Sequence, residues 1–225
     1  MAITTTDVAL LRLLQLSSAA LPVGGYSFSQ GLEFAIDDGW VTDQQSTENW
    51  LRLQLGESMA NVDLPLLQRL MNAIQQQNLV SLEYWNDYGL ACRETSELRL
   101  TDTAMGKALI RLTNGLGLPL VLPAVEEVSF TTAFGLAAEH WKIDIRTASH
   151  GYCWSWLENQ VAAAVKLVPL GQTSAQCLLG TLLQEIPQAI DRSEKIEDYQ
   201  IGASLPALAI ASAKHETQYS RLFRS

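Results

Sequence analysis

Leucine, alanine, glutamine and glutamate recur along this chain at three- and four-residue steps, and no run of alternating β-branched residues stands between turn signals. This spacing favours helices over strands along the whole length. The 225 residues contain no glycine- or serine-rich linker and no internal repeat. The sequence therefore predicts an all-α fold, a single compact domain over residues 1–225 made of about ten helices with short connections.

The expected helices are bounded by hydroxyl caps, first-turn prolines and terminal glycines. They cover residues 6–20, 28–37, 42–59, 63–77, 79–93, 94–114, 130–140, 149–168, 173–189 and 205–219. Thr42 and Gln45 have the spacing of a capping box, and Leu10, Leu13, Leu14 and Ser17 should share one face of the first helix. The apolar, proline-broken stretch 116–123 is expected to be a buried connection.

Several classes of protein are disfavoured by the apolar runs, the cysteines and the charge. The run 116–125 carries two prolines and falls well short of the roughly 20 apolar residues that a membrane-spanning helix needs. The N-terminus lacks the features of a secretory signal, and the three cysteines are widely spaced, so we expect a cytoplasmic protein without disulfides. A net charge of −9 should repel nucleic acid and anionic membranes.

Residues 21–33, LPVGGYSFSQGLE, hold three glycines, a proline, two aromatic residues and several hydroxyl or amide side chains, more than a plain connection between helices needs. The pattern is not a phosphate-binding glycine motif or a nucleophile elbow. Instead the two adjacent glycines should turn the chain, and a capping box of Ser27 and Gln30 should start a helix at Phe28. On that helix an acidic stripe would lie opposite the apolar face, formed by Ser29, Glu33 and Asp37. Two aromatic residues, Tyr26 and Phe34, are left either to pack in a wide core or to contact a partner.

No catalytic or metal-binding constellation is evident. The histidines at 140, 150 and 215 lack the spacing of metalloprotease motifs, and the cysteines lack CxxC pairs. We therefore expect a protein that is not an enzyme. The alternative is a metal-binding protein or a hydrolase in its own right, acting through His150, Cys153, His215 or the carboxylates. His150 and Cys153 are three residues apart on an expected helix, which suits two ligands but does not make a site.

The last twelve residues, KHETQYSRLFRS, hold three basic residues against one acidic residue, unlike the acidic remainder. This C-terminal segment, about 214–225, should dock either on the chain itself or on a partner. Leu208, Ser212, His215, Tyr219 and Leu222 should share one helical face. His215 is then either a buried, hydrogen-bonded residue or part of a contact surface.

Three separated stretches resemble the UreF family of urease accessory proteins. They are residues 10–33 (LLRLLQLSSAALPVGGYSFSQGLE), 165–173 (VKLVPLGQT) and 212–225 (SAKHETQYSRLFRS). The resemblance implies a non-enzymatic, all-helical homodimer that joins the accessory protein UreD or UreH and recruits the GTPase UreG to apo-urease. Nickel and GTP would act through that complex, with no tightly bound cofactor in the chain, and GTP hydrolysis would be coupled to nickel insertion.

The resemblance places partner surfaces at residues 22–33, at Lys166 and at residues 215–224, and the helical projection of the opening motif adds Phe34 to the expected partner-binding residues. They are Gly24, Gly25, Tyr26, Ser29, Glu33, Phe34, Lys166, His215, Glu216, Tyr219, Arg221, Phe223 and Arg224. Lys166 would face the GTPase, although its position also suits a lysine whose charged end simply reaches solvent from a helix end. Lysine lacks the planar fork of an arginine finger, so direct activation of a GTPase through Lys166 is the weaker idea.

Overall fold

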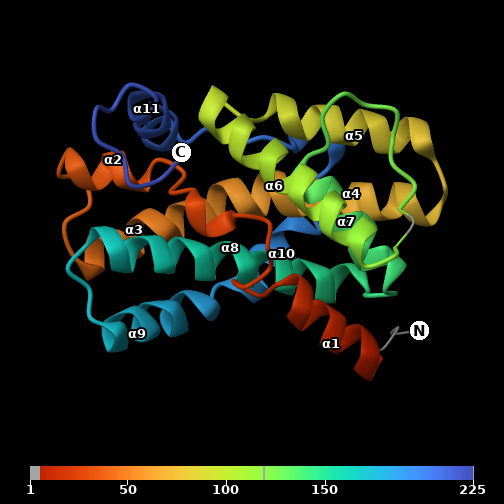
Figure 1. Ribbon diagram of the computed structural model, residues 1–225, viewed down its shortest axis with the longest axis horizontal. Helices are drawn as coiled ribbons and strands as arrows, with labels where there is room; N and C mark the ends of the chain where they lie inside the picture. The colour runs from red at the N-terminus through yellow and green to blue at the C-terminus, as the bar shows by residue number, and fades with distance from the viewer. Residues whose placement is uncertain (1–5, 119, 225) are drawn as a thin grey trace.

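The expectation of an all-α chain is confirmed. A computed structural model describes residues 6–118 and 120–224, and within these ranges every regular element is helical (Figure 1). The α-helices are α1 (Asp7–Leu16), α2 (Leu32–Asp37), α3 (Gln44–Leu53), α4 (Leu64–Gln75), α5 (Leu79–Ala91), α6 (Ser96–Gly115), α7 (Phe130–His140), α8 (Ile145–Leu167), α9 (Gln172–Leu183), α10 (Ile186–Ser193) and α11 (Pro206–His215). Two 3-10 turns, η1 (Gly25–Ser27) and η3 (Asp198–Gln200), and a π-helical segment, η2 (Gln54–Asp63), complete the set.

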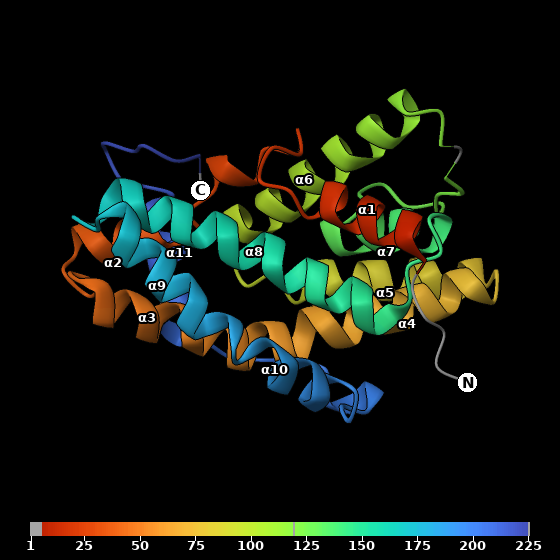
Figure 2. The same cartoon turned by 90° about the horizontal axis from the view of Figure 1, so that it is seen from below.

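Helix α8 is the longest helix and lies at the centre of the packing, with α3 and α9 alongside it (Figures 1 and 2). The main core cluster takes side chains from α1, from α3 to α4 and from α6 to α10, and includes Phe134, Leu157 and Leu182. A second cluster joins α2, the end of α8, α11 and Phe223. This second cluster fixes the position of the C-terminal segment.

Side-chain caps explain where most of these helices begin. Thr6 accepts a hydrogen bond from Ala9 N–H at 3.2 Å, as expected for the cap of the first helix. The box expected at Thr42 and Gln45 is one residue off, because Asp43 and Ser46 form it instead. An aspartate accepts the amide hydrogen bond more strongly than a threonine, since its carboxylate is charged.

The break expected between residues 59 and 63 is wrong. α3, η2 and α4 run without interruption from residue 44 to residue 75. The η2 segment is π-helical, and most of it is buried, including Leu55, Met59 and Asp63. Pro65 is tolerated because it lies in the first turn of α4, where the altered hydrogen-bond pattern of the preceding π turns leaves room for a residue without N–H.

Other expected boundaries also shift. Asp144 caps α8, which therefore starts four residues before the expected position, and α7 has the expected bounds. The helix expected over 173–189 is two helices, because Pro187 lies in the first turn of a new helix, α10, which begins at Ile186. The helix expected over 205–219 ends at His215. The tail beyond this residue follows an irregular path.

One connection expected to be buried is partly exposed, and one expected helix face is divided between the core and solvent. The connection after α6 includes Leu116 and Val121, which are 43% and 67% exposed. On α1 the buried residues are Ala9, Leu13 and Leu16, while Leu10 and Leu14 face outward. Across residues 6–118 and 120–224, the structure contains no helix long and apolar enough to cross a membrane.

Candidate partner-binding site

The glycines of the opening motif turn the chain, but the helix after them starts later than expected. The capping box of Ser27 and Gln30 is wrong. Gln30 and Gly31 both have positive φ, 51° and 82°, and α2 begins at Leu32. The side chain of Gln30 is engaged elsewhere, because its Oε1 accepts from Trp156 Nε1–H at 3.0 Å.

Two glycines of the motif also allow close packing. A Cβ on Gly31 would lie 3.1 Å from the backbone nitrogen of Ser212, so α11 can approach the motif only because this residue has no side chain. A Cβ on Gly25 would likewise lie 3.0 Å from Nδ2 of Asn159 on α8. Gly24 has φ +80° and open space around it, so it serves the turn itself.

The predicted acidic stripe on α2 is wrong, because Ser29 and Glu33 are buried. Glu33 belongs to a buried triad with His215 and Glu97. His215 Nε2 lies 3.0 Å from Glu33 Oε2, and its Nδ1 lies 2.9 Å from Glu97 Oε2. His215 has no exposed surface. The buried, hydrogen-bonded alternative for His215 is therefore the one that the geometry supports.

His215 lies between two buried carboxylates, one at each of its ring nitrogens. A neutral imidazole has only one N–H donor, whereas two carboxylates face its two nitrogens. Burial raises the pKa of Glu97, and the hydrogen bond and charge of His215, together with Arg221, oppose that rise.

The C-terminal tail docks on this triad. The N–H groups of Leu222 and Phe223 donate to the two oxygens of Glu33, at 2.6 and 2.9 Å. Arg221 Nη1 lies 3.2 Å from Glu97 Oε1. Residues 216–224 therefore lie against the chain's own α2 and α6, and the loop after α11 passes beside α2 in Figure 1. Phe223 is buried in the second cluster.

Lys166, in the last turn of α8, lies beside the same tail. It is exposed, and its Nζ is 5.9 Å from the ring centre of Tyr26 and 5.4 Å from that of Phe223. Such cation–π contacts hold a lysine in place at modest energetic gain. The structure thus brings together three predicted residues from distant parts of the chain, with Tyr26 and Lys166 open to solvent.

The remaining predicted residues are dispersed around the tail. Tyr219 is fully exposed, while Glu216 accepts from the hydroxyl of Ser96 at 2.5 Å. Arg224 is exposed, and its N–H donates to the carbonyl of Ser27 at 2.9 Å. Phe34 is half-buried, packs edge-on against Trp40 and lies against the second cluster, which also holds Phe223.

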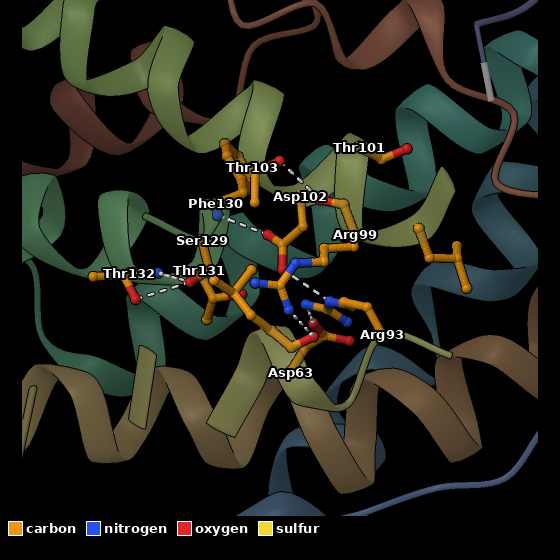
Figure 3. Close-up of polar contacts among 12 residues, drawn as sticks. Asp63, Arg93, Arg99, Thr101, Asp102, Thr103, Ser129, Phe130, Thr131 and Thr132 are labelled. Carbon is orange, nitrogen blue, oxygen red and sulfur yellow. Dashed lines mark hydrogen bonds and ion pairs between the residues drawn. The ribbon is translucent and has the colours of Figure 1, made fainter. Parts of the chain in front are cut away.

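A second buried charge cluster was not anticipated from the sequence. Arg93 bridges Asp63 and Asp102, with N–O distances of 2.7 and 2.8 Å, and Figure 3 shows the three side chains converging. The other oxygen of Asp102 accepts from Phe130 N–H at 2.7 Å, which ties α6 to the start of α7. The cluster lines a cavity of about 110 Å³. Its members lie in η2, in the connection between α5 and α6, and in α6, so no spacing in the sequence signals it.

The residues considered as metal ligands do not form a site. The described ranges contain no group of three or more His, Cys, Asp or Glu side chains arranged to hold a metal ion. His150 is exposed, with Nδ1 2.8 Å from the Arg146 carbonyl oxygen. Cys153 is buried in the core, where burial and the charge of Asp63 raise the pKa of its thiol. A buried thiol of this kind is a poor source of the thiolate that binds metals.

Comparison with known proteins gives one consistent result. The family model UreF matches residues 41–183. A urease accessory protein UreF from Marinomonas sp. (strain MWYL1) is 58% identical over 223 residues, covering 99% of this chain and 97% of that protein. Proteins of the same name from Alkalilimnicola ehrlichii and Pseudomonas entomophila are 45% and 47% identical, covering 99% and 98% of this chain and 98% and 99% of their own lengths. The resemblance seen in the sequence is thereby confirmed, and the chain belongs to the UreF family of urease accessory proteins.

Proposed function

We propose that this chain is a urease maturation factor that acts as a scaffold and not as an enzyme. With UreD or UreH it recruits the GTPase UreG to apo-urease, and it couples GTP hydrolysis to nickel insertion. Nickel and GTP act through the partner complex, the chain holds neither tightly, and it works as a cytoplasmic homodimer. Family membership supports this role, because the relatives are named urease accessory proteins.

The observation that carries the proposal is the docked tail. The buried triad of Glu33, His215 and Glu97 holds residues 221–223 by their side-chain and backbone donors. The exposed groups next to it are Tyr26, Lys166 and Tyr219. An ordered surface of aromatic and cationic side chains is typical of protein contacts, because little conformational entropy is lost when a partner binds.

Buried members of the predicted set act indirectly in this proposal. Ser29, Glu33, His215 and Phe223 cannot touch a partner while the tail is docked, since each is less than a tenth exposed. Their role is to position the tail. Lys166 contributes as a fixed charge between two aromatic rings, a geometry that suits surface contact better than a catalytic finger.

Reconstitution tests this function. The full chain is mixed with UreD or UreH, UreG, apo-urease, nickel and GTP, and urease activity and co-purification are measured. The wild type should assemble and activate urease. Deletion of residues 218–225 should abolish co-purification while circular dichroism shows largely intact helicity. Equilibrium dialysis of the isolated chain against micromolar nickel distinguishes the alternative, since tight binding by the chain alone would contradict the scaffold role.

A further inference from the structure

A hollow of about 330 Å³ lies between the turn at residues 22–28 and the outer face of α6. Its floor is apolar and includes Val23, Phe28 and Ala108. Its rim carries three exposed cations, Lys107, Arg111 and Arg224. Among the described residues that line it there is no carboxylate. This concentration of positive charge is unusual for a chain with a net charge of −9.

The three cations have no ion pair within residues 6–118 and 120–224, whereas most other arginines of the chain are paired. Lys107 and Arg111 are four residues apart on α6, so they repel each other on one face of the helix. The helix dipole favours a cation in the last turn of α6, but Arg111 lies before that turn and so gains little from the dipole. The free chain therefore gains no evident stability from this pair.

The tail completes the rim of the hollow. Arg224 reaches it because its N–H is bonded to the Ser27 carbonyl, and Phe223 next to it is buried. The hollow also includes Gly24, whose positive φ shapes its edge. The basic rim is thus continuous with the exposed groups around the docked tail.

We propose that this hollow binds an acidic segment of a protein partner, whose Asp or Glu side chains pair with Lys107, Arg111 and Arg224. Charge complementarity selects the occupant, since the rim is cationic and the rest of the chain is acidic. The open, shallow shape with all three cations at the solvent edge fits side chains of a docking protein better than an enclosed small anion. This inference rests on the proposed scaffold function and names the chemistry of one contact in it.

The test compares two double charge reversals in the full chain. Lys107→Glu/Arg111→Glu reverses the rim, and Lys142→Glu/Lys195→Glu makes the same change in net charge at exposed positions elsewhere. Affinity for UreD or UreH and for UreG is measured by titration at several sodium chloride concentrations. The rim variant should bind at least one of these partners about ten-fold or more weakly and lose part of the salt dependence, because reversed rim charges repel an acidic segment. The control variant should bind like the wild type.

The outcomes separate the two proposals. If the wild type assembles and the rim variant matches it in affinity and in salt dependence, the hollow is not the contact, although the scaffold function stands. If the wild type itself does not assemble with either partner, the scaffold function fails. Titration with sodium phosphate provides a further check: millimolar binding that only the rim variant loses would make the occupant a small anion and overturn the acidic segment. Circular dichroism and thermal melting confirm that both variants fold.

Discussion

Replacement of His215 by leucine tests the buried triad most directly. The substitution keeps an apolar side chain of similar bulk in the site but removes the ring nitrogens that contact Glu33 and Glu97, both less than a tenth exposed. Two buried carboxylates would then depend on Arg221 and the tail N–H groups alone. Removing one partner of a buried charge pair costs about 3–5 kcal/mol.

That cost is large relative to a typical free energy of unfolding of about 5–15 kcal/mol. For a chain of 225 residues it corresponds to a fall in Tm of roughly 6–20 °C. The measurement is chemical and thermal unfolding followed by circular dichroism. His140→Leu is the matched control, because His140 is exposed and its replacement should change stability by less than about 0.5 kcal/mol.

A second substitution separates electrostatics from packing. Adding Glu97→Gln to the His215→Leu variant removes one uncompensated charge, so the double variant should regain about 0.5–3 kcal/mol relative to the single variant. A His215→Leu protein as stable as the His140→Leu control would refute the reasoning. So would a double variant whose two losses simply add, since the carboxylates would then not be coupled to the histidine.

Three further predictions concern packing, thiol reactivity and pH. Gly106→Ala should cost about 1–3 kcal/mol in unfolding experiments, because its Cβ would lie 2.2 Å from the Val128 carbonyl oxygen, whereas Gly180→Ala, with open space around it, should stabilise α9 by about 0.5–1 kcal/mol; equal effects would contradict the packing. A thiol reagent should label exposed Cys177 in the native protein and buried Cys153, whose thiol pKa is raised, only after denaturation; native labelling of both would show that the core opens. Burial raises the pKa of Glu97 above 4.5, so the contribution of Glu97 to stability is greatest below that pH and is lost as pH rises through the folded-state pKa. The stability of Glu97→Gln relative to wild type should therefore increase from about pH 4.5 to about pH 7. A stability difference between the two proteins that does not change with pH would argue against the pKa shift.

The helical character of the chain and several helices could be predicted because they depend on local sequence. The bounds of α7 follow from short-range periodicity, and Thr6 caps α1 through a hydrogen bond to a residue three positions away. The start of α2 could not be predicted in this way. Gln30 has the right spacing for a capping box, but its side chain binds Trp156, 126 residues away. A distant partner thus outweighed the local signal.

The candidate site shows the same limit. The resemblance singled out the opening motif and the tail, which the structure places in contact, whereas the burial of Glu33 could not be predicted. A glutamate on a short helix is usually solvated, and this one is buried because His215 and the tail supply its donors from the other end of the chain. The cluster of Asp63, Arg93 and Asp102 was missed for the same reason. The division between α9 and α10 is different, because Pro187 is a local signal from which it could have been predicted.

The contacts of the triad join residues far apart in the sequence, so they can form only late in synthesis. Glu33 and His215 are separated by 182 positions, and the ribosome makes residues 215–224 long after Glu33 and Glu97. Until then the two carboxylates have no histidine or tail donors, so α2 and α6 cannot bury them without a penalty. A nascent chain, or one cut before residue 215, should therefore keep this corner open to proteases. The buried contacts of Glu33 and Glu97 therefore form only after residues 215–223 are made, and so does the surface proposed to meet partners.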